Sequence, residues 1–432
     1  MRFRASDVAV ASGGRLEGDD VDLEGVSFDS RSLRPGHLFV PIVADRDGHD
    51  FLESAMASGA GAYLTHGRTV PGSTSIHVPD TVRAFLDLAA WSRDRFPERV
   101  VGITGSVGKT STKDLAAAVL RRRWRVTANE RSFNNDQGLP HTMLNAPDDT
   151  EALVVEMGMR GFGEIARLCE VARPNVGVVT AIAPAHTERV GGIEGVARAK
   201  GELIEALPSG GTAVLNADHP LIVAMATRTS ARVLTFGAAG DVRVEGLVLD
   251  ALARARFTLA TPWGSAEVEL AVSGAHMAGN AAAAAAVGLL HDVSLADVVA
   301  GLADATLSPW RMELTPAPAG GVVINDAYNA NPASMRAALD TLAALPADRR
   351  VAVLGVMAEL ADPLEDHREI ARHVRDLGIE LIAVGTDLYG VEPSTDPVAA
   401  VGSVAGGCAV LVKGSRVAGL ERVAAALLAP GA

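Results

Sequence analysis

The chain has few cysteines and fewer positive than negative charges. Only Cys169 and Cys408 are present among its 432 residues, so neither a disulfide framework nor a cysteine-based zinc site is available. Lysine and arginine number 39 against 52 aspartates and glutamates, a formal net charge of −13, and such a surface repels polyanions. We therefore expect a cytoplasmic protein that does not bind nucleic acid.

The chain also lacks long apolar runs. The N-terminal segment MRFRASDVAVASGG contains no apolar region of the signal-peptide kind. The alanine-rich stretch at 281–290 falls far short of the about 20 residues that a membrane helix needs, so we expect a buried helix there and no membrane insertion. Since a domain typically has about 150 residues, the length of the chain predicts two to four domains, with three as the central expectation.

Three segments differ in their pattern. Residues 1–90 mix short apolar runs with Gly, Asp and Ser, which indicates a small α/β domain. Residues 91–308 repeat strand, Gly-rich turn and helix, which favours a mainly parallel sheet, whereas 241–272 alternate like an antiparallel meander at a sheet edge. Residues 309–432 predict a Rossmann-like domain. The expected fold class is α/β in three domains.

A phosphate-binding loop is predicted in the segment VGITGSVGKTST. An apolar strand passes through a Gly-rich turn into a helix, where backbone N–H groups and the helix dipole can hold phosphates. Lys109 would neutralise the β and γ oxygens of a nucleotide, and Thr110 would bind Mg²⁺. A plain Gly-rich turn with a surface lysine is the alternative. The residues expected to contact ATP here are Thr104, Gly105, Ser106, Val107, Gly108, Lys109, Thr110 and Ser111.

Two further residues follow neighbouring strands. Glu156 ends the strand pattern ALVVEMG and His186 follows NVGVVTAIA, so both should emerge at the carboxyl edge of the sheet. Oxygen ligands with one imidazole suit Mg²⁺ held mainly by substrate phosphates. Taken alone, His186 would more often be a polar residue with its hydrogen bonds satisfied in a loop, and Glu156 a solvated strand end. Lys200 lies in the helical pattern GIEGVARAKGELIEAL, and by that pattern alone it would face solvent.

The compact form of the phosphate loop narrows the class of nucleotide-binding protein to which the chain can belong. The general P-loop pattern has a glycine where this chain has Ile103, and the form Thr104-Gly105-x-x-Gly108-Lys109-Thr110 resembles the loop of Mur ligases and folylpolyglutamate synthetases. It disfavours GTPases and motor ATPases. Other segments that resemble the Mur ligase family are spread over most of the chain: FDSRSLRPGHLFVPI, DGHDF, SFNNDQGLPHTML, PAHTERVGG, SGAHMAGNAAAAAA, WRMEL, INDAYNANPASM and LVKGSR.

The resemblance implies roles in all three domains, with ATP and Mg²⁺ as cofactors. Lys200 would be carbamylated by CO₂, which turns a cation into an anion that can bridge metal ions. The implied metal ligands are Thr110, Glu156, His186 and Lys200. The implied catalytic residues are Lys109, His186, Lys200 and Arg311. ATP would further contact Asn280, Arg311, Asp326, Tyr328 and Asn329. The uridine-linked precursor, held by the first domain, and the incoming dipeptide would contact Ser30, Arg31, Asp47, His49, Asn134, Asn135, Lys413 and Arg416.

The resemblance also implies an activity. The string DAYNANPASM at 326–335 is typical of the family member that joins D-alanyl-D-alanine to UDP-N-acetylmuramoyl-tripeptide through an acyl phosphate, for peptidoglycan synthesis. We expect a monomeric ligase with these two partners. A diamino-acid-adding Mur ligase or a folylpolyglutamate-synthetase-like ligase is the alternative, and a non-catalytic paralogue is a third possibility. Val356, where the family usually has an acidic residue, places amino-acid specificity in question.

Overall fold

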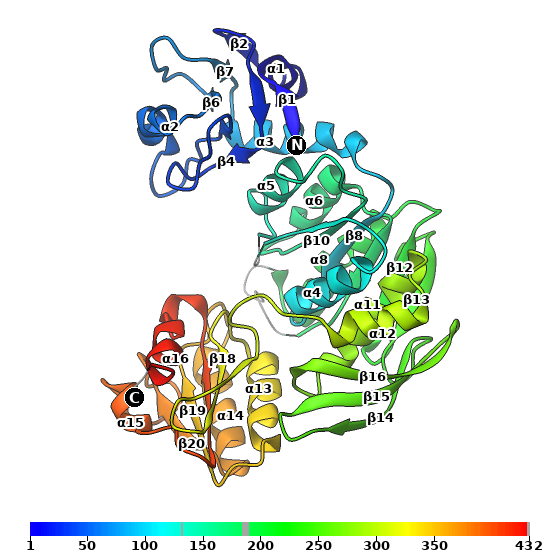
Figure 1. Ribbon diagram of the computed structural model, residues 1–432, viewed down its shortest axis with the longest axis vertical. Helices are drawn as coiled ribbons and strands as arrows, with labels where there is room; N and C mark the ends of the chain where they lie inside the picture. The colour runs from blue at the N-terminus through cyan, green and yellow to red at the C-terminus, as the bar shows by residue number, and fades with distance from the viewer. Residues whose placement is uncertain (131–132, 184–189, 430–432) are drawn as a thin grey trace.

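The computed structural model describes residues 1–130, 133–183 and 190–429 as three α/β domains. Figure 1 shows the N-terminal domain at the top, the central domain in the middle and the C-terminal domain at the lower left. The expected three-domain α/β fold class is confirmed. Among the residues so described, no helix is both long and apolar enough to cross a membrane.

The N-terminal domain is built on a five-stranded mixed sheet of order β2-β7-β6-β5-β4, beside an antiparallel β1–β3 pair. Its last long helix, α3, begins after Asp80, whose side chain accepts hydrogen bonds from the N–H groups of Val82 and Arg83. The elements are β1 (Arg2–Arg4), α1 (Ala5–Ser12), β2 (Arg15–Glu17), β3 (Asp22–Glu24), β4 (Val26–Ser27), β5 (Leu38–Phe39), η1 (Gly48–Phe51), α2 (Leu52–Ala57), β6 (Ala62–Thr65), β7 (Ser75–His77), α3 (Thr81–Ser92) and η2 (Arg93–Arg95).

The central domain contains a six-stranded parallel sheet of order β13-β12-β11-β8-β10-β9. Its elements as far as the last strand are β8 (Val100–Thr104), α4 (Lys109–Leu120), β9 (Val126–Ala128), α5 (Gly138–Leu144), β10 (Ala152–Glu156), α6 (Glu164–Ala172), β11 (Val176–Val179), α8 (Ile193–Lys200), α9 (Glu202–Glu205), β12 (Thr212–Asn216), α10 (Pro220–Val223), η3 (Ala224–Arg228) and β13 (Arg232–Phe236). Because β8 lies between β10 and β11, the carboxyl ends of these three strands meet at one edge.

Both faces of the parallel sheet are buried. Ile103 and Val154 belong to the core that contains α4 and α11 (Met277–Leu290), whereas Leu153 and Val155 belong to the core that contains α3 and α6. The two sets alternate along the strands because successive side chains point to opposite faces. A sheet covered on both faces needs the near-continuous apolar runs seen in the sequence.

The meander expected at a sheet edge forms a sheet of its own. Strands β14 (Arg243–Leu249), β15 (Arg254–Thr261) and β16 (Gly264–Ser273) pair antiparallel, so the predicted pairing is correct and the predicted position is wrong. They continue the core rather than the parallel sheet, because Phe257 and Val268 pack into the cluster shared with α11 (Met277–Leu290) and α12 (Leu295–Ala303). The alanines of α11 are buried, as expected.

The C-terminal domain has a sheet of order β17-β18-β21-β19-β20, parallel except for β17. Helix α13 begins with Asn331 as its cap, since the Asn331 side chain accepts from the Ser334 N–H, and with Pro332 in its first turn. The elements are β17 (Glu313–Pro316), β18 (Val322–Asp326), α13 (Pro332–Ala344), β19 (Arg349–Leu354), α14 (Pro363–Asp376), β20 (Glu380–Ala383), α15 (Pro397–Val401), β21 (Cys408–Lys413), η4 (Arg416–Ala418) and α16 (Glu421–Leu427).

Candidate active site

The predicted phosphate loop joins β8 to α4. Its two glycines have positive φ, +153° at Gly105 and +83° at Gly108. A Cβ at Gly105 would collide with the hydroxyl of Thr180, and one at Gly108 would lie 2.6 Å from Asn280 Oδ1. Only glycine fits this close approach. The loop therefore contacts Asn280, which the resemblance associates with adenine.

Lys109, the first residue of α4, folds back over the loop. Its Nζ donates to the carbonyl of Gly105 at 2.8 Å. Burial lowers the pKa of Lys109, while the Glu156 carboxylate acts to raise it. The ammonium is thus held beside the loop, where it can neutralise phosphate oxygens.

Glu156 links the loop to the neighbouring strand. Its side chain is buried, with the residue only 1% exposed, and accepts from Thr110 Oγ1 at 2.8 Å and from Asn134 Nδ2 at 2.6 Å. Its own N–H donates to Asn129 Oδ1 at 2.6 Å. A carboxylate and a hydroxyl beside a phosphate loop are the oxygen donors that Mg²⁺ uses with nucleotides, so these residues fit the implied metal.

Lys200 is buried, which corrects the solvent-facing position that its helical pattern favoured. The residue is 3% exposed at the end of α8. Its pKa is well below the ordinary lysine value, first because of burial and second because of the nearby Lys109 cation, with Glu156 opposing both. An uncharged amine is the form that reacts with CO₂. The expected metal ligand His186 lies outside the described residues.

Arg311 brings the C-terminal domain to the phosphate loop. Its NH2 group donates to Thr110 Oγ1 at 3.1 Å, and its guanidinium lies 4.3 Å from the centre of the Tyr328 ring. The loop and both residues line a cavity of about 120 Å³ at the junction of the two domains. The cavity is lined by Ser106, Val107, Gly108, Lys109, Thr110, Ser111, Asn134, Glu156, Arg311, Tyr328, Asn329, Asn331 and Ser334.

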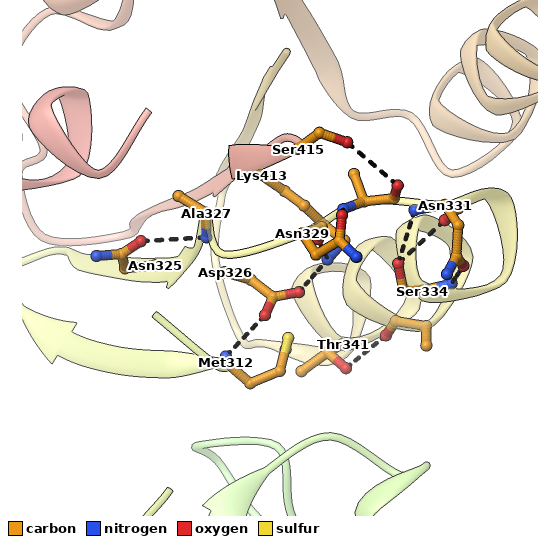
Figure 2. A network of polar contacts seen from close by, with 12 residues as sticks. Met312, Asn325, Asp326, Ala327, Asn329, Asn331, Ser334, Thr341, Lys413 and Ser415 are labelled. Carbon is orange, nitrogen blue, oxygen red and sulfur yellow. Dashed lines mark hydrogen bonds and ion pairs between the residues drawn. The ribbon is translucent and has the colours of Figure 1, made fainter. Parts of the chain in front are cut away.

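Asp326 and Lys413 form an ion pair beside this cavity (Figure 2). Lys413 Nζ also donates to the carbonyl of Asn329 at 2.9 Å, and Asp326 Oδ1 accepts from the N–H of Met312 at 3.0 Å. Burial lowers the pKa of Lys413, whereas Asp326 acts to raise it. Both predicted ligand residues are therefore engaged with the protein itself.

The predicted substrate residues of the N-terminal domain are not among the described residues that line the cavity. Arg31 forms a two-point ion pair with Asp29, at 2.9 and 2.8 Å. Asp47 accepts from the backbone N–H of the buried His49 and contacts its Nδ1 at 2.6 Å. Ser30 lies in the same N-terminal domain. These contacts hold the N-terminal loops in place.

Asn135 and Arg416 also have contacts within the protein. Asn135 Oδ1 accepts from the Gly138 N–H at 3.0 Å, at the start of α5. The Arg416 guanidinium lies 4.6 Å from the centre of the Trp310 ring and pairs with Glu421 at 2.7 Å. Of the expected ATP-loop residues, Thr104 is turned inward, with its hydroxyl donating to the Met157 carbonyl at 2.8 Å.

Thr180 is a loop-supporting residue that sequence reasoning missed. Its hydroxyl donates to the carbonyl of Val107 at 2.5 Å, directly inside the phosphate loop. Thr180 directly follows β11, and Glu156 ends β10. A polar residue at the carboxyl end of β11, which lies beside β8, was the sequence signal that could have identified Thr180.

The Val356 departure lies in a loop held by the C-terminal core. The Val356 carbonyl accepts from the Ser415 N–H at 2.9 Å, and His367 Nε2 accepts from the Met357 N–H at 2.9 Å. Glu359 in the same loop has a left-handed φ of +64°, and its carboxylate acts to raise the pKa of Lys109. The loop therefore faces the site, although position 356 has a valine where the family usually has an acidic residue.

The fold and the site define a member of the Mur ligase family, and the chain belongs to it: residues 103–288 match the Mur ligase middle domain and residues 310–431 match the Mur ligase, glutamate ligase domain. Among its relatives, the UDP-N-acetylmuramoyl-tripeptide–D-alanyl-D-alanine ligase of Mycobacterium tuberculosis H37Rv is 42% identical, over 84% of this chain and 77% of that protein. The enzyme of the same name from Escherichia coli K12 is 36% identical over 96% of each.

Solved structures agree with this assignment. The chain is similar to MurF from Acinetobacter baumannii with a TM-score of 0.90 at 28% identity, over 99% of both chains. It is also similar to MurF ligase from Thermotoga maritima in complex with ADP, with a TM-score of 0.83 at 27% identity, over 94% of this chain and 97% of that one. The similarity therefore extends through all three domains.

Proposed function

We propose that the chain is an ATP-dependent ligase that joins D-alanyl-D-alanine to UDP-N-acetylmuramoyl-tripeptide in peptidoglycan precursor synthesis. The observation that carries the proposal is the contact of Arg311 with Thr110, because it closes a cavity lined by the phosphate loop between two domains. The substrates in this proposal are those in the names of two relatives, which are 42% and 36% identical to this chain. The proposal includes that the protein acts in the cytoplasm, that it consumes ATP and that it works as a monomer.

The reaction needs an activated acyl group, because a carboxylate and an amine do not condense in water unaided. The terminal carboxylate of the tripeptide attacks the γ-phosphorus of ATP, which gives an acyl phosphate and ADP. The amine of the dipeptide then attacks the acyl carbon, inorganic phosphate leaves and the amine proton is released. The protein contributes mainly by positioning reactants and stabilising charge.

The residues of the cavity divide this work. Lys109 would neutralise the transferring phosphoryl group and Arg311 would stabilise the charge that develops on it, since a guanidinium fork suits phosphate oxygens. Mg²⁺, when bound, would offset the charge of the phosphates. Thr110, Glu156 and carbamylated Lys200 would hold it, with His186 as the further ligand that the family resemblance implies.

Carbamylation of Lys200 is supported by its burial beside Glu156. The reaction joins the neutral amine to the carbon of CO₂ and releases one proton. Burial lowers the pKa of Lys200, which favours this neutral amine. The product carries a negative charge, so it would change the electrostatic balance around Lys109 in favour of a bound metal ion.

The test is phosphate release from ATP by the purified chain. We expect release only when UDP-N-acetylmuramoyl-tripeptide and D-alanyl-D-alanine are both present, with mass spectrometry showing the pentapeptide product. Diaminopimelate or lysine with UDP-N-acetylmuramoyl-dipeptide, and glutamate with a folate, serve as the comparison substrates. Faster turnover with either comparison pair would refute the assignment, and so would release that requires neither substrate.

A further inference from the structure

We propose that Asp326 and Lys413 are positioning residues that hold Arg311 on the phosphate loop. The inference rests on the proposed role of Arg311 in phosphoryl transfer. It assigns to the two residues a positioning function that the family resemblance does not imply.

The turn that carries Arg311 has an unusual backbone conformation. The residues that flank Arg311, which are Trp310 and Met312, have left-handed φ values of +62° and +50°. Bulky side chains rarely adopt this region, and such a conformation persists only where the surrounding structure holds it. A turn with two such residues would relax if its support were removed, and the Arg311 side chain would move with it.

Asp326 provides the buried support of this turn. Its Oδ1 accepts the N–H of Met312 at 3.0 Å, and both residues are buried, with Asp326 only 7% exposed. Figure 2 shows the Asp326 side chain directed at the Met312 N–H from the end of β18. On the other side, the Trp310 N–H donates to the exposed Glu313 at 3.3 Å, a longer contact that water can replace.

Lys413 holds Asp326 in place. The two residues are direct partners at the ends of the parallel strands β18 and β21. Lys413 is 1% exposed, and its Nζ contacts the second carboxylate oxygen of Asp326 and the carbonyl of Asn329. A buried carboxylate without a cation would take up a proton or turn toward water. The Met312 contact therefore depends on Lys413.

The pair is placed behind the cavity. Arg311, Tyr328 and Asn329 line the space above the phosphate loop, but among the described residues that line it neither Asp326 nor Lys413 is found. Both residues are instead bonded to protein groups that fix the Arg311 turn and the Asn329 backbone. The contacts run in sequence from Lys413 through Asp326 and Met312 to Arg311, which donates to Thr110 at 3.1 Å.

A double-mutant cycle tests this chain of contacts. We expect Arg311→Ala to lower kcat roughly 10²–10³-fold, the usual cost of one charge-stabilising donor. Lys413→Met should lower kcat roughly 10–100-fold through misplacement of Arg311, with the KM for D-alanyl-D-alanine changed less than about twofold. In the Arg311→Ala background, Lys413→Met should cost less than about twofold more, because no guanidinium is left to position.

The cycle is protected against folding effects. Rates are referred to folded protein, measured by near-ultraviolet circular dichroism, and the cycle is repeated with Asp326→Asn/Lys413→Met, which leaves no unpaired buried charge. Arg349→Met is a control on the same sheet, since the partly exposed Arg349 pairs with Glu380 at 2.8 Å at the opposite end of the strands. It should change kcat less than about twofold in either background.

Three results would count against the proposal. Additive losses in the two backgrounds would mean that Lys413 acts independently of Arg311. A rise of tenfold or more in the KM for D-alanyl-D-alanine would identify Lys413 as a dipeptide contact instead. If Arg311→Ala leaves kcat unchanged while the ligase reaction proceeds, the role of Arg311 fails and the positioning role fails with it, although the proposed overall reaction stands.

Discussion

Replacement of Glu156 by glutamine separates the charge of this residue from its hydrogen bonds. The carboxylate accepts from Thr110 at 2.8 Å and from Asn134 at 2.6 Å. A glutamine oxygen can still accept from Asn134, and its amide can donate to Thr110 Oγ1. The shape and the number of contacts are kept, while the negative charge beside Lys109 and Lys200 is lost.

The stability change should be small because two effects oppose each other. A hydrogen bond to a charged group contributes about 1.5–3 kcal/mol against about 1 kcal/mol for a neutral one, so the two contacts lose roughly 1–4 kcal/mol together. The neutral amide in turn avoids much of the cost of burying a carboxylate. We expect the free energy of unfolding to change by no more than about 1–2 kcal/mol.

Activity should fall much further than stability. The glutamine amide competes with Arg311 for the lone pairs of Thr110, and the site loses the carboxylate that fits Mg²⁺. A loss of about 10²–10³-fold in kcat corresponds to roughly 2.7–4 kcal/mol of transition-state stabilisation. Phosphate release measured across a Mg²⁺ titration should also show a higher half-saturating Mg²⁺ concentration.

Glu151→Gln is the matched control for this change. Glu151 lies just before β10, at the opposite end from Glu156, and also has two contacts, from the Arg125 N–H at 3.0 Å and the Arg125 side chain at 3.2 Å. This control should retain kcat within about twofold. If Glu156→Gln keeps kcat within threefold of the unaltered protein and shows the same Mg²⁺ dependence, Glu156 is not part of the metal site.

Three further predictions concern buried titratable groups. Lys200→Met should lower kcat roughly 10²–10³-fold with thermal stability kept or raised. It should also abolish the carbamate signal that the unaltered protein gives in ¹³C NMR under ¹³CO₂. In the unaltered protein this signal should weaken toward acid pH, because protonation of Lys200 blocks the reaction with CO₂. Cys169, with its pKa raised to about 12 by burial, and the buried Cys408 should react with a thiol reagent only after unfolding. Burial lowers the pKa of His291 to about 4, so stability should fall by about 3 kcal/mol as pH drops from 6.5 to 4, and His291→Leu should remove that loss in urea unfolding.

The sign of the His291 effect follows from proton uptake. Well above pH 6.5 the imidazole is neutral in both the folded and the unfolded chain, so it contributes no pH dependence there. Between 6.5 and about 4 the unfolded chain binds the proton and the folded chain does not, which favours unfolding. An unchanged acid transition in His291→Leu would show that this residue is not responsible.

Local pattern predicted the parts of the site that depend on neighbouring residues. The phosphate loop was predictable because strand, turn and helix are continuous in sequence from Val100 to Leu120. Glu156 was predictable because the carboxyl ends of parallel strands meet at one edge. The register that brings it beside Thr110 is set by the pairing of β10 with β8.

Tertiary contacts decided the parts that pattern could not predict. Lys200 has the spacing of an exposed helical residue, yet α8 turns it toward Lys109 and Glu156. Asp326 and Lys413 are 87 residues apart, and only the pairing of β18 with β21 makes them direct partners. The alternation at 241–272 fixed strand character but carried no information on which sheet the strands would join.

The local charge of the site explains how a chain of net charge −13 can bind a polyphosphate. Lys109 and Arg311 each bring a positive charge to the cavity and Glu156 a negative one, which leaves one net positive charge, while burial lowers the pKa of Lys200 and so favours its neutral form. Conversion of Lys200 to a carbamate adds −1 and brings the set to zero. An unmodified site should therefore favour ATP without its metal, and a modified one should favour the magnesium complex. Nucleotide binding measured across a Mg²⁺ titration, with and without CO₂, distinguishes the two: if CO₂ has no effect on the Mg²⁺ dependence of binding, the carbamate does not belong to the site.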